Sequence, residues 1–496
     1  MQRVSSESRL SRRCDRRPLP HTGRAASAVV VAALAAAGCG VETDVETDSV
    51  TEAVTEGTID QQAVHRVFEE ACSVAGRRAL ALSGSCRILS VSRTDLALGN
   101  HIVEYNATVQ VGPDAVHEII GLHRVVKELA PWTPIITFDS LMMVHGDAWS
   151  FDSAFRDSPE SGAAPIFLAQ HNVDVWGIDL RWTQVSPETK DFTFMKDWGL
   201  DTDGQDLGMA LSIARAVRYY TGSGFSKMLL LGWSRGGQTG YTYLSTETTR
   251  PASQRHVRGF IPVETFVKFG PNDSRQADAC ARIHDPVQGN LAPYEAGVYA
   301  SNQTGLLATL GELAASQPDG LSPFSLQGQP FFGYVNKQVA LAAGEATFQF
   351  LFKPFAPHYH FTGGRFDDNG VPTGLSYVAD EQRWFRTLQL AGPFEPLKLL
   401  LDSDAMTCND GSSNLDAHLA QITVPVFYIG AGGGIGAAGL HTLTLLGSRD
   451  TRSLIQSVTP GDDLHDLGHF DIWLSQHAQH LWWQPILHWI QEQRTY

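Results

Sequence analysis

The sequence predicts an α/β protein with a mostly parallel central sheet, helices on both faces and a large, mostly helical insertion. The first observation is that strand-like and helix-like stretches alternate between residues 140 and 263. The second is that this alternation stops over residues 266–420 and resumes with the apolar run that starts at Val424. Such alternation is typical of parallel sheets covered by helices, and the interruption is too long for a loop.

The N-terminus is predicted to be a targeting segment. Residues 1–24 are rich in Arg, and residues 25–37 form an uncharged run as long as a signal-peptide hydrophobic region. The run leads into Ala-Ala-Gly-Cys39, which resembles the lipobox of bacterial lipoproteins. The resemblance implies cleavage of residues 1–38 and lipidation of Cys39, and an ordinary secretory signal is the alternative. Residues 39–58 are acidic and rich in Thr, so they are expected to form a tether.

Four cysteines remain once the cysteine of the leader and Cys39 are set aside. In an exported protein these four are expected to form two disulfides. Proximity in the sequence favours Cys72 with Cys86, which leaves Cys280 to pair with Cys408. Three connectivities are possible for four cysteines, and the sequence does not choose among them.

The first part of the core is predicted to span residues 59–265. It is expected to begin with an amphipathic helix near 64–78 and a hairpin of two partly alternating strands, 103–111 and 116–126, around a Gly-Pro-Asp turn. The next strands are expected, in order, at 140–144, 173–179, 227–232 and 257–263. A helix with apolar residues at helical spacing is expected at 206–220, between the second and third of these strands.

Residues 266–420 are predicted to form an inserted cap. Helical spacing recurs near 293–316, 336–353 and 380–392, and the segment contains many Phe. Residues 421–496 are predicted to complete the core. Their expected elements are strands at 424–429 and 453–458 and a helix at 473–491.

The sharpest motif is Gly232-Trp-Ser234-Arg235-Gly236, which lies between an apolar strand and a helix-compatible stretch. Gly-x-Ser-x-Gly in this context is typical of a nucleophile elbow, where the tight turn leaves no room for side chains at 232 and 236. The turn presents the serine hydroxyl at a helix N-terminus, where backbone N–H groups favour a developing anion. Ser234 is therefore the predicted nucleophile, and the backbone N–H of Arg235 is a predicted oxyanion-hole donor.

Two further motifs lie in the order along the chain that this architecture requires. His145-Gly146-Asp147 comes after a strand, at the position where a second oxyanion donor is expected, so the backbone N–H of Asp147 is the candidate. Gly468-His469 comes after the last expected strand and before the last helix. His469 is therefore the predicted general base, with His465 in reserve.

Residues 130–265 and 420–496 resemble the α/β-hydrolase superfamily, particularly its capped esterases and lipases. Within it, Asp174-Val-Trp and His469-Phe-Asp-Ile-Trp are similar to motifs of acid lipases. The resemblance implies an α/β-hydrolase fold and a triad of serine, acid and histidine.

The triad acid departs from the usual pattern of this superfamily. An Asp is expected soon after the strand at 424–429, but residues 430–440 are mostly glycine and contain no acid. Some members place the acid at the end of the preceding core strand, where this sequence has Glu264. A carboxylate there could orient the imidazole and stabilise its cation. Asp466 and Asp450 remain alternatives, although Asp450 is expected at the opposite end of the sheet.

No cofactor or metal is expected. Gly432-x-Gly434-x-x-Ala437 fits a variant of the dinucleotide fingerprint, but only about 60 residues follow it, too few for the βαβαβ unit that grips a dinucleotide. Close approach of backbone beside the active site is the preferred explanation of these glycines. The sequence contains no Cys-x-x-Cys pair, which disfavours a structural zinc site.

Together the motifs predict a serine hydrolase that cleaves carboxylic esters through an acyl-enzyme. The Phe-rich cap favours a small ester with an apolar acyl or alcohol part. A net charge of -16 argues against nucleic acid as a partner. A serine peptidase or amidase, and a non-catalytic lipid-anchored binding protein on the same scaffold, are the alternatives. We expect export to the cell envelope or the medium, with membrane contact only through the lipid.

Overall fold

A ten-stranded sheet, β1-β2-β3-β6-β5-β7-β8-β13-β14 with β4 paired to β3, carries the fold in a computed structural model of the chain. The structure describes residues 59–78, 86–97, 100–156, 162–285, 289–327, 331–345, 360–462 and 465–495. The predicted signal peptide, the predicted lipidation site Cys39 and the predicted tether lie outside these residues.

The sheet has an antiparallel part and a parallel part. The antiparallel strands are β1 (Arg87–Ala97), β2 (Ile102–Gln110), β3 (Ile119–Ala130) and the short β4 (Thr133–Pro134). The parallel strands are β5 (Ser140–Val144), β6 (Asp174–Asp179), β7 (Met228–Trp233), β8 (Val257–Val263), β13 (Val426–Ala431) and β14 (Thr451–Gln456). Since β3 runs antiparallel to β6, the two parts join into one sheet.

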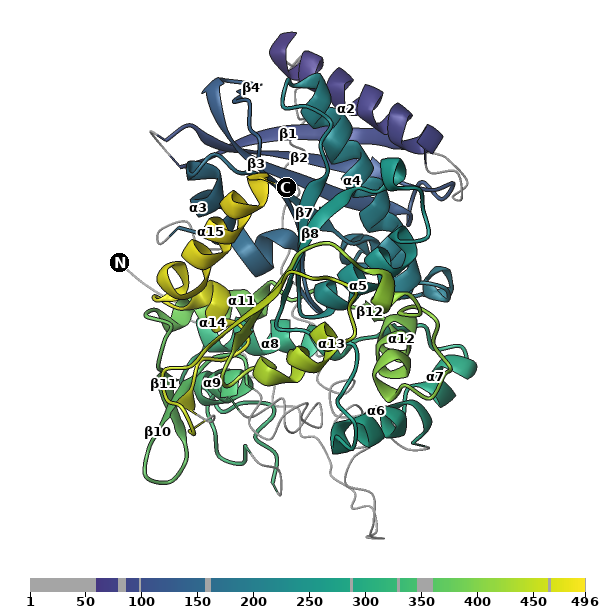
Figure 1. The fold of residues 1–496 in the computed structure, drawn as a ribbon. Coiled ribbons are helices and arrows are strands. Elements are labelled where there is room, and N and C mark those ends of the chain that lie inside the picture. The colour runs from purple at the N-terminus through teal and green to yellow at the C-terminus, as the bar shows by residue number, and fades with distance from the viewer. Residues whose placement is uncertain are drawn as a thin grey trace, which may run out of the picture. The chain divides into compact units, whose positions relative to one another are not determined.

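Helices cover both faces of the sheet, as predicted (Figure 1). One face packs against α2 (Ile59–Arg78), α4 (Leu200–Tyr220) and α5 (Arg235–Glu247), and the other against α3 (Ala164–Gln170) and α15 (Gln484–Glu492). Successive side chains of a strand point to opposite faces, so Leu141 and Met143 join one buried core while Met142 and Val144 join the other. Both faces are therefore apolar, which explains the nearly continuous apolar runs of these strands.

The chain between β8 and β13 forms the mostly helical cap that the sequence predicted. In its described residues the helices are α6 (Ser274–His284), α7 (Leu291–Glu295), α8 (Gln303–Ser316), α9 (Asn336–Glu345), α11 (Glu381–Gln389) and α12 (Leu397–Cys408). Short ladders connect β9 (Ala300–Ser301) to β12 (Glu395–Pro396) and β10 (Gly364–Phe366) to β11 (Pro372–Leu375). Helix α12 packs on α6, and α8 packs on α9 and α11.

Two predicted helices are broken in the structure. The stretch at 293–316 is divided into α7 and α8, because Gly297 adopts a left-handed φ of +93° and β9 follows it. The C-terminal stretch at 473–491 is divided into α14 (Asp471–Leu474), a π-helical turn (Gln479–Trp483) and α15, where Ser475 is extended.

The described part of the chain contains two disulfides, with the pairing that sequence proximity favours. Cys72 of α2 is bonded to Cys86 just before β1, and Cys280 of α6 is bonded to Cys408 at the end of α12. The second bond therefore ties together two helices of the cap. In the part of the chain that the structure describes, no helix has the length and apolar character needed to cross a membrane.

Candidate active site

Ser234 lies in a strained turn between β7 and α5. Its φ of 56° and ψ of -124° fall in a region that non-glycine residues rarely adopt. A Cβ atom on Gly232 would lie 2.3 Å from the carbonyl oxygen of Gly236, and one on Gly236 would lie 2.3 Å from that of His145. Both glycines are therefore required by backbone approach. Ser234 itself is partly exposed.

His469 and Glu264 form a buried pair. The Nδ1 atom of His469 lies 3.0 Å from Oε2 of Glu264, and the two residues are 1% and 0% exposed. The backbone N–H groups of Ala431 and Gly436 donate to Oε1 over 2.7 and 3.0 Å, and that of Ile435 donates to Oε2 over 2.6 Å. Three backbone N–H groups therefore hold the buried carboxylate in one orientation.

The sheet topology explains why these segments meet. Strands β5, β7, β8 and β13 are neighbours and parallel, so the residues that follow them lie along one edge. Trp233 pairs with Val263, which places Ser234 and Glu264 directly after neighbouring strand ends. The N–H of Ser234 donates to the carbonyl of Val263 over 2.9 Å. Ligand and catalytic groups in α/β proteins gather at this carboxyl edge.

The glycine-rich loop after β13 encloses the Glu264 carboxylate. A Cβ atom on Gly434 would lie 2.0 Å from Oε2 of Glu264, so a side chain there would displace the carboxylate. Glu264 has a φ of 49°, a left-handed conformation directly after β8. The loop carries no acid of its own, and the space beside it is filled by an acid from the neighbouring strand.

The segment around His469 is anchored by Asp471 and by the cap. The N–H groups of Gly468 and Gly363 donate to Oδ2 of Asp471 over 2.7 and 3.0 Å. The N–H of His469 donates to the carbonyl of His360 over 2.9 Å. Burial raises the pKa of Asp471 to about 7, against the lowering effect of its two N–H bonds. The acid-lipase-like motif at 469–473 thus includes a residue that shapes the histidine loop.

The alternative acids are bound by other groups, although Asp466 also lies against the glycine-rich loop, beside Gly432. Asp466 is buried, and its Oδ1 accepts the backbone N–H groups of Val458, Thr459 and Leu467. Asp450 pairs with Arg452 at the start of β14, the end of the sheet opposite to Ser234. The reserve histidine, His465, is half-exposed at its side chain and pairs with Asp462.

The His145-Gly146-Asp147 segment passes directly beside Ser234. A Cβ atom on Gly146 would lie 2.8 Å from Cβ and 3.3 Å from Oγ of Ser234. Burial lowers the pKa of His145, so its imidazole is neutral. His145 Nε2 accepts the N–H of Leu180 over 3.2 Å, and Nδ1 donates to the carbonyl of Gly146 over 2.9 Å. His145 therefore fixes this segment to the end of β6.

The side chains of Asp147 and Arg235 form an ion pair that is not predicted from the sequence. Arg235 Nε lies 2.9 Å from Asp147 Oδ1, and Nη2 lies 2.8 Å from Oδ2. Arg235 Nη1 also donates to Gln238 Oε1 over 2.7 Å. These residues are 88 positions apart in the chain, and only their side-chain chemistry hints at the contact.

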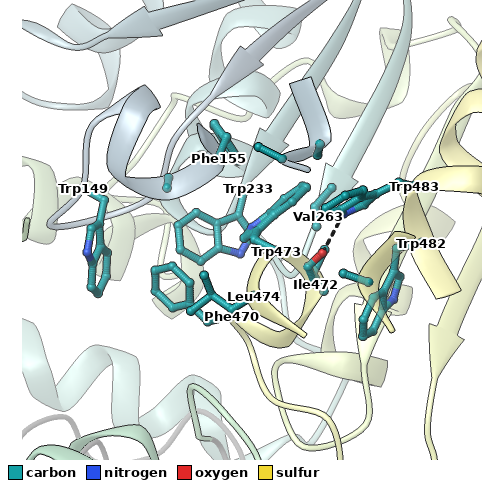
Figure 2. Packing of buried hydrophobic residues seen from close by; sticks show 14 of the residues in the cluster. Trp149, Phe155, Trp233, Val263, Phe470, Ile472, Trp473, Leu474, Trp482 and Trp483 are labelled. Atoms are coloured by element: carbon teal, nitrogen blue, oxygen red, sulfur yellow. Dashed lines mark hydrogen bonds between the residues drawn. The ribbon is translucent and has the colours of Figure 1, made fainter. Parts of the chain in front are cut away.

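Aromatic rings pack behind the elbow and the histidine loop (Figure 2). The ring of Trp233 lies 4.9 Å from that of His469 and 4.6 Å from that of Phe470. Trp149 lies 4.6 Å from Phe470, and Trp473 packs on Phe155. The elbow and the histidine loop therefore pack against buried aromatic side chains.

Two other groups of charged residues are held by ion pairs. Asp174 begins β6 at the far edge of the sheet and pairs with the buried Arg124 and Arg218. The ligand atoms of Glu104, His123 and Asp152 lie within 4.8 Å of one another and could hold a metal ion. Arg156 pairs with both carboxylates of that cluster and supplies positive charge there.

Comparisons with known proteins support the fold. No family model and no curated protein matches the chain. A candidate lipase from Sulfolobus solfataricus of known crystal structure aligns with a TM-score of 0.55 and 17% identity, over 82% of this chain and 99% of its own. A monoglyceride lipase from Saccharomyces cerevisiae aligns with a TM-score of 0.40 and 11% identity, over 76% and 92% of the two chains. An esterase from Thermogutta terrifontis aligns with a TM-score of 0.37 and 12% identity, over 78% and 99%. The sheet order and the first of these alignments show that the chain has the fold of the α/β hydrolases.

Proposed function

We propose that the chain is a serine hydrolase that cleaves carboxylic esters through an acyl-enzyme on Ser234. The observation that carries the proposal is the buried His469–Glu264 pair, which lies at the same sheet edge as the strained Ser234. A carboxylate held by three backbone N–H groups is suited to fix the tautomer of an imidazole and to stabilise its cation.

The reaction follows from these roles. Ser234 Oγ attacks the ester carbonyl carbon while its proton passes to Nε2 of His469. The negative charge on the carbonyl oxygen is held by the backbone N–H groups of Asp147 and Arg235. Collapse of the intermediate releases the alcohol, which takes the proton from His469. Water then attacks the acyl-enzyme by the same route and frees the carboxylic acid.

A loop after β13 without an acid would favour a non-catalytic scaffold. The carboxylate of Glu264, which accepts the N–H of Ile435 in that loop, supports catalysis instead. The apolar surroundings of His469, with Phe361 6.2 Å away between ring centres, favour an ester with an apolar part.

The proposal is tested by steady-state hydrolysis of p-nitrophenyl esters of increasing acyl length, with aminoacyl anilides in parallel. We expect turnover of the esters that is lost in Ser234→Ala and in His469→Ala, while both variants keep the melting temperature of the wild type. Turnover of anilides but not of esters would assign an amidase. Equal ester turnover in wild type and Ser234→Ala would refute the nucleophile.

Export is part of the same proposal. The two disulfides are expected in an oxidising compartment, and they fit the predicted signal segment at residues 1–38. Lipidation of Cys39 is tested by mass spectrometry of the N-terminal peptide of protein from bacterial cells. A diacylated Cys39 supports the anchor, and an unmodified N-terminus near this position supports simple secretion.

A further inference from the structure

We propose that the Asp147–Arg235 ion pair and Glu395 of the cap are positioning residues that hold the oxyanion hole in the geometry of the transition state. The inference rests on the proposed serine hydrolase function and extends it from backbone donors to the side chains that align them. Through Glu395, the cap would act indirectly, by positioning the segment that carries one oxyanion donor.

The two oxyanion donors come from separate segments, one after β5 and one at the start of α5. To act on one oxygen, both N–H groups must lie about 2.7–3.1 Å from the same point. Their own side chains link the segments, because the guanidinium of Arg235 meets both carboxylate oxygens of Asp147 at 2.9 and 2.8 Å. A bidentate pair of this kind fixes orientation as well as distance.

The guanidinium is itself held on its other side. Arg235 Nη1 donates to Oε1 of Gln238 over 2.7 Å, and Gln238 Nε2 donates to the carbonyl of Phe266 over 3.0 Å. The Arg235 and Asp147 side chains are only 12% and 31% exposed. Such partial burial weakens the competition from water and makes the pair a firmer link than a surface ion pair.

The cap holds the next residue of the oxyanion segment. Ala148 has a left-handed φ of 68°, which is strained for a residue with a side chain. Its N–H donates to Oε1 of the buried Glu395 over 2.6 Å, and its carbonyl accepts the N–H of Gly392 over 2.5 Å. Trp149 Nε1 donates to the carbonyl of Thr387 over 2.8 Å. Three bonds from one cap segment therefore maintain the strained turn.

Glu395 can approach Asp147 without strong repulsion because it favours the neutral form. Burial raises the pKa of Glu395 well above its usual range, and Asp147 raises it further, while Arg235 opposes the shift. Since Glu395 takes the N–H of Ala148, that group is not free for the substrate. The N–H of Asp147 is left as the donor on this side of Ser234.

The test is kinetic, on the full-length protein and an ester that the wild type cleaves. We expect Arg235→Met and Asp147→Asn each to lower kcat by about 10- to 100-fold, with KM within about threefold, because misplacement near 1 Å has effects of this size. The double variant should be no slower than the slower single variant, since both remove one link. Affinity for an arylboronic acid, whose adduct with serine mimics the tetrahedral intermediate, should fall in parallel with kcat.

Glu395 is tested with two substitutions. Glu395→Ala should lower kcat in the same way, because Ala148 loses its acceptor, whereas Glu395→Gln should retain most activity through its amide oxygen. The matched control is Arg156→Met, which breaks the ion pair between Arg156 and Asp152. The two groups lie 2.5 Å apart, and the side chains are 29% and 36% exposed, respectively. This substitution should leave kcat unchanged.

The outcomes separate this inference from the function on which it rests. A wild type without ester turnover or boronate binding refutes both. If the wild type is active and Arg235→Met has the same kcat as the wild type, the positioning role of the Asp147–Arg235 pair alone is refuted. Strictly multiplicative losses of kcat in the double variant would refute it as well. Equal loss in Glu395→Gln and Glu395→Ala would show that the carboxylate does not act through the N–H of Ala148.

Discussion

Glu264→Gln is the substitution that probes the candidate triad most sharply. It keeps the size of the side chain but replaces one oxygen by an NH2 group. Glu264 accepts bonds at Oε1 from Ala431 and Gly436, and at Oε2 from Ile435 and the imidazole of His469. Every acceptor site of the carboxylate therefore faces a donor, and a glutamine has no orientation that satisfies all of them.

The size of the effect can be worked out for each orientation. With the amide nitrogen at the Oε2 position, His469 must accept through Nδ1 and carry its proton on Nε2, so it cannot take the proton of Ser234. A wrong tautomer of this kind lowers kcat by about 10⁴, or about 5 kcal/mol of barrier. With the nitrogen at the Oε1 position, two buried N–H groups lose their acceptor, at roughly 1–3 kcal/mol each in folding stability.

The assay is ester turnover together with urea unfolding of the same preparations. We expect Glu264→Gln to fold, to lose a few kcal/mol of stability and to lose about 10²–10⁴ in kcat, depending on which orientation dominates. The matched control is Asp450→Asn, at the opposite edge of the sheet, which should be nearly silent.

Asp466→Asn tests the competing assignment. Because Asp466 holds three backbone N–H groups, we expect this substitution to lower stability more than kcat. Full activity in Glu264→Gln combined with collapse in Asp466→Asn would show that the acid had been assigned to the wrong residue, and would leave Ser234 and His469 in place.

Three further predictions concern the supports of the site. Gly434→Ala should push the Glu264 carboxylate away from His469 and lower kcat for ester hydrolysis by at least tenfold. Gly204→Ala is the control and should leave kcat unchanged, because the added Cβ would have its nearest neighbours at 3.8 Å. Asp471→Asn should gain stability over the wild type between pH 5 and 8, measured by urea unfolding. The pKa of Asp471 is raised to about 7 in the folded chain, from an ordinary value near 4. The stability that the protonated acid contributes is therefore complete below pH 4 and is lost as the pH rises from 4 through 7. Asp174→Asn should lower stability by about 3–5 kcal/mol in urea unfolding without changing KM, because Arg124 and Arg218 stay buried and charged.

Much of the fold and part of the candidate site could be predicted from local sequence patterns. The strand–helix alternation could be predicted because both faces of the parallel strands are buried, which leaves apolar runs bounded by turns. Ser234 could be predicted because backbone contact demands glycine at two fixed positions around it. Strand β1 was not predicted, since residues 87–97 alternate weakly. Among its side chains with a described burial, Ile88 and Val91 are buried and Leu96 is partly buried against the core.

What the sequence could not provide are contacts between distant segments. The loop after β13 lacks an acid, and this absence pointed to Glu264. The sequence could not show that three N–H groups at this loop surround the carboxylate of Glu264, because that arrangement depends on the fold. The Asp147–Arg235 pair and the bond from Ala148 to Glu395 join residues 88 and 247 positions apart. Charged residues at such separations have many alternative partners in an unfolded chain.

The central claim is that Ser234 is an activated nucleophile, and reaction with a fluorophosphonate probe followed by peptide mass spectrometry tests it most directly. We predict one adduct per folded chain, on the peptide that contains Ser234, with no labelling of Ser234→Ala or of urea-unfolded wild type. Labelling that persists in folded Ser234→Ala, or a folded wild type that does not react, would contradict the claim.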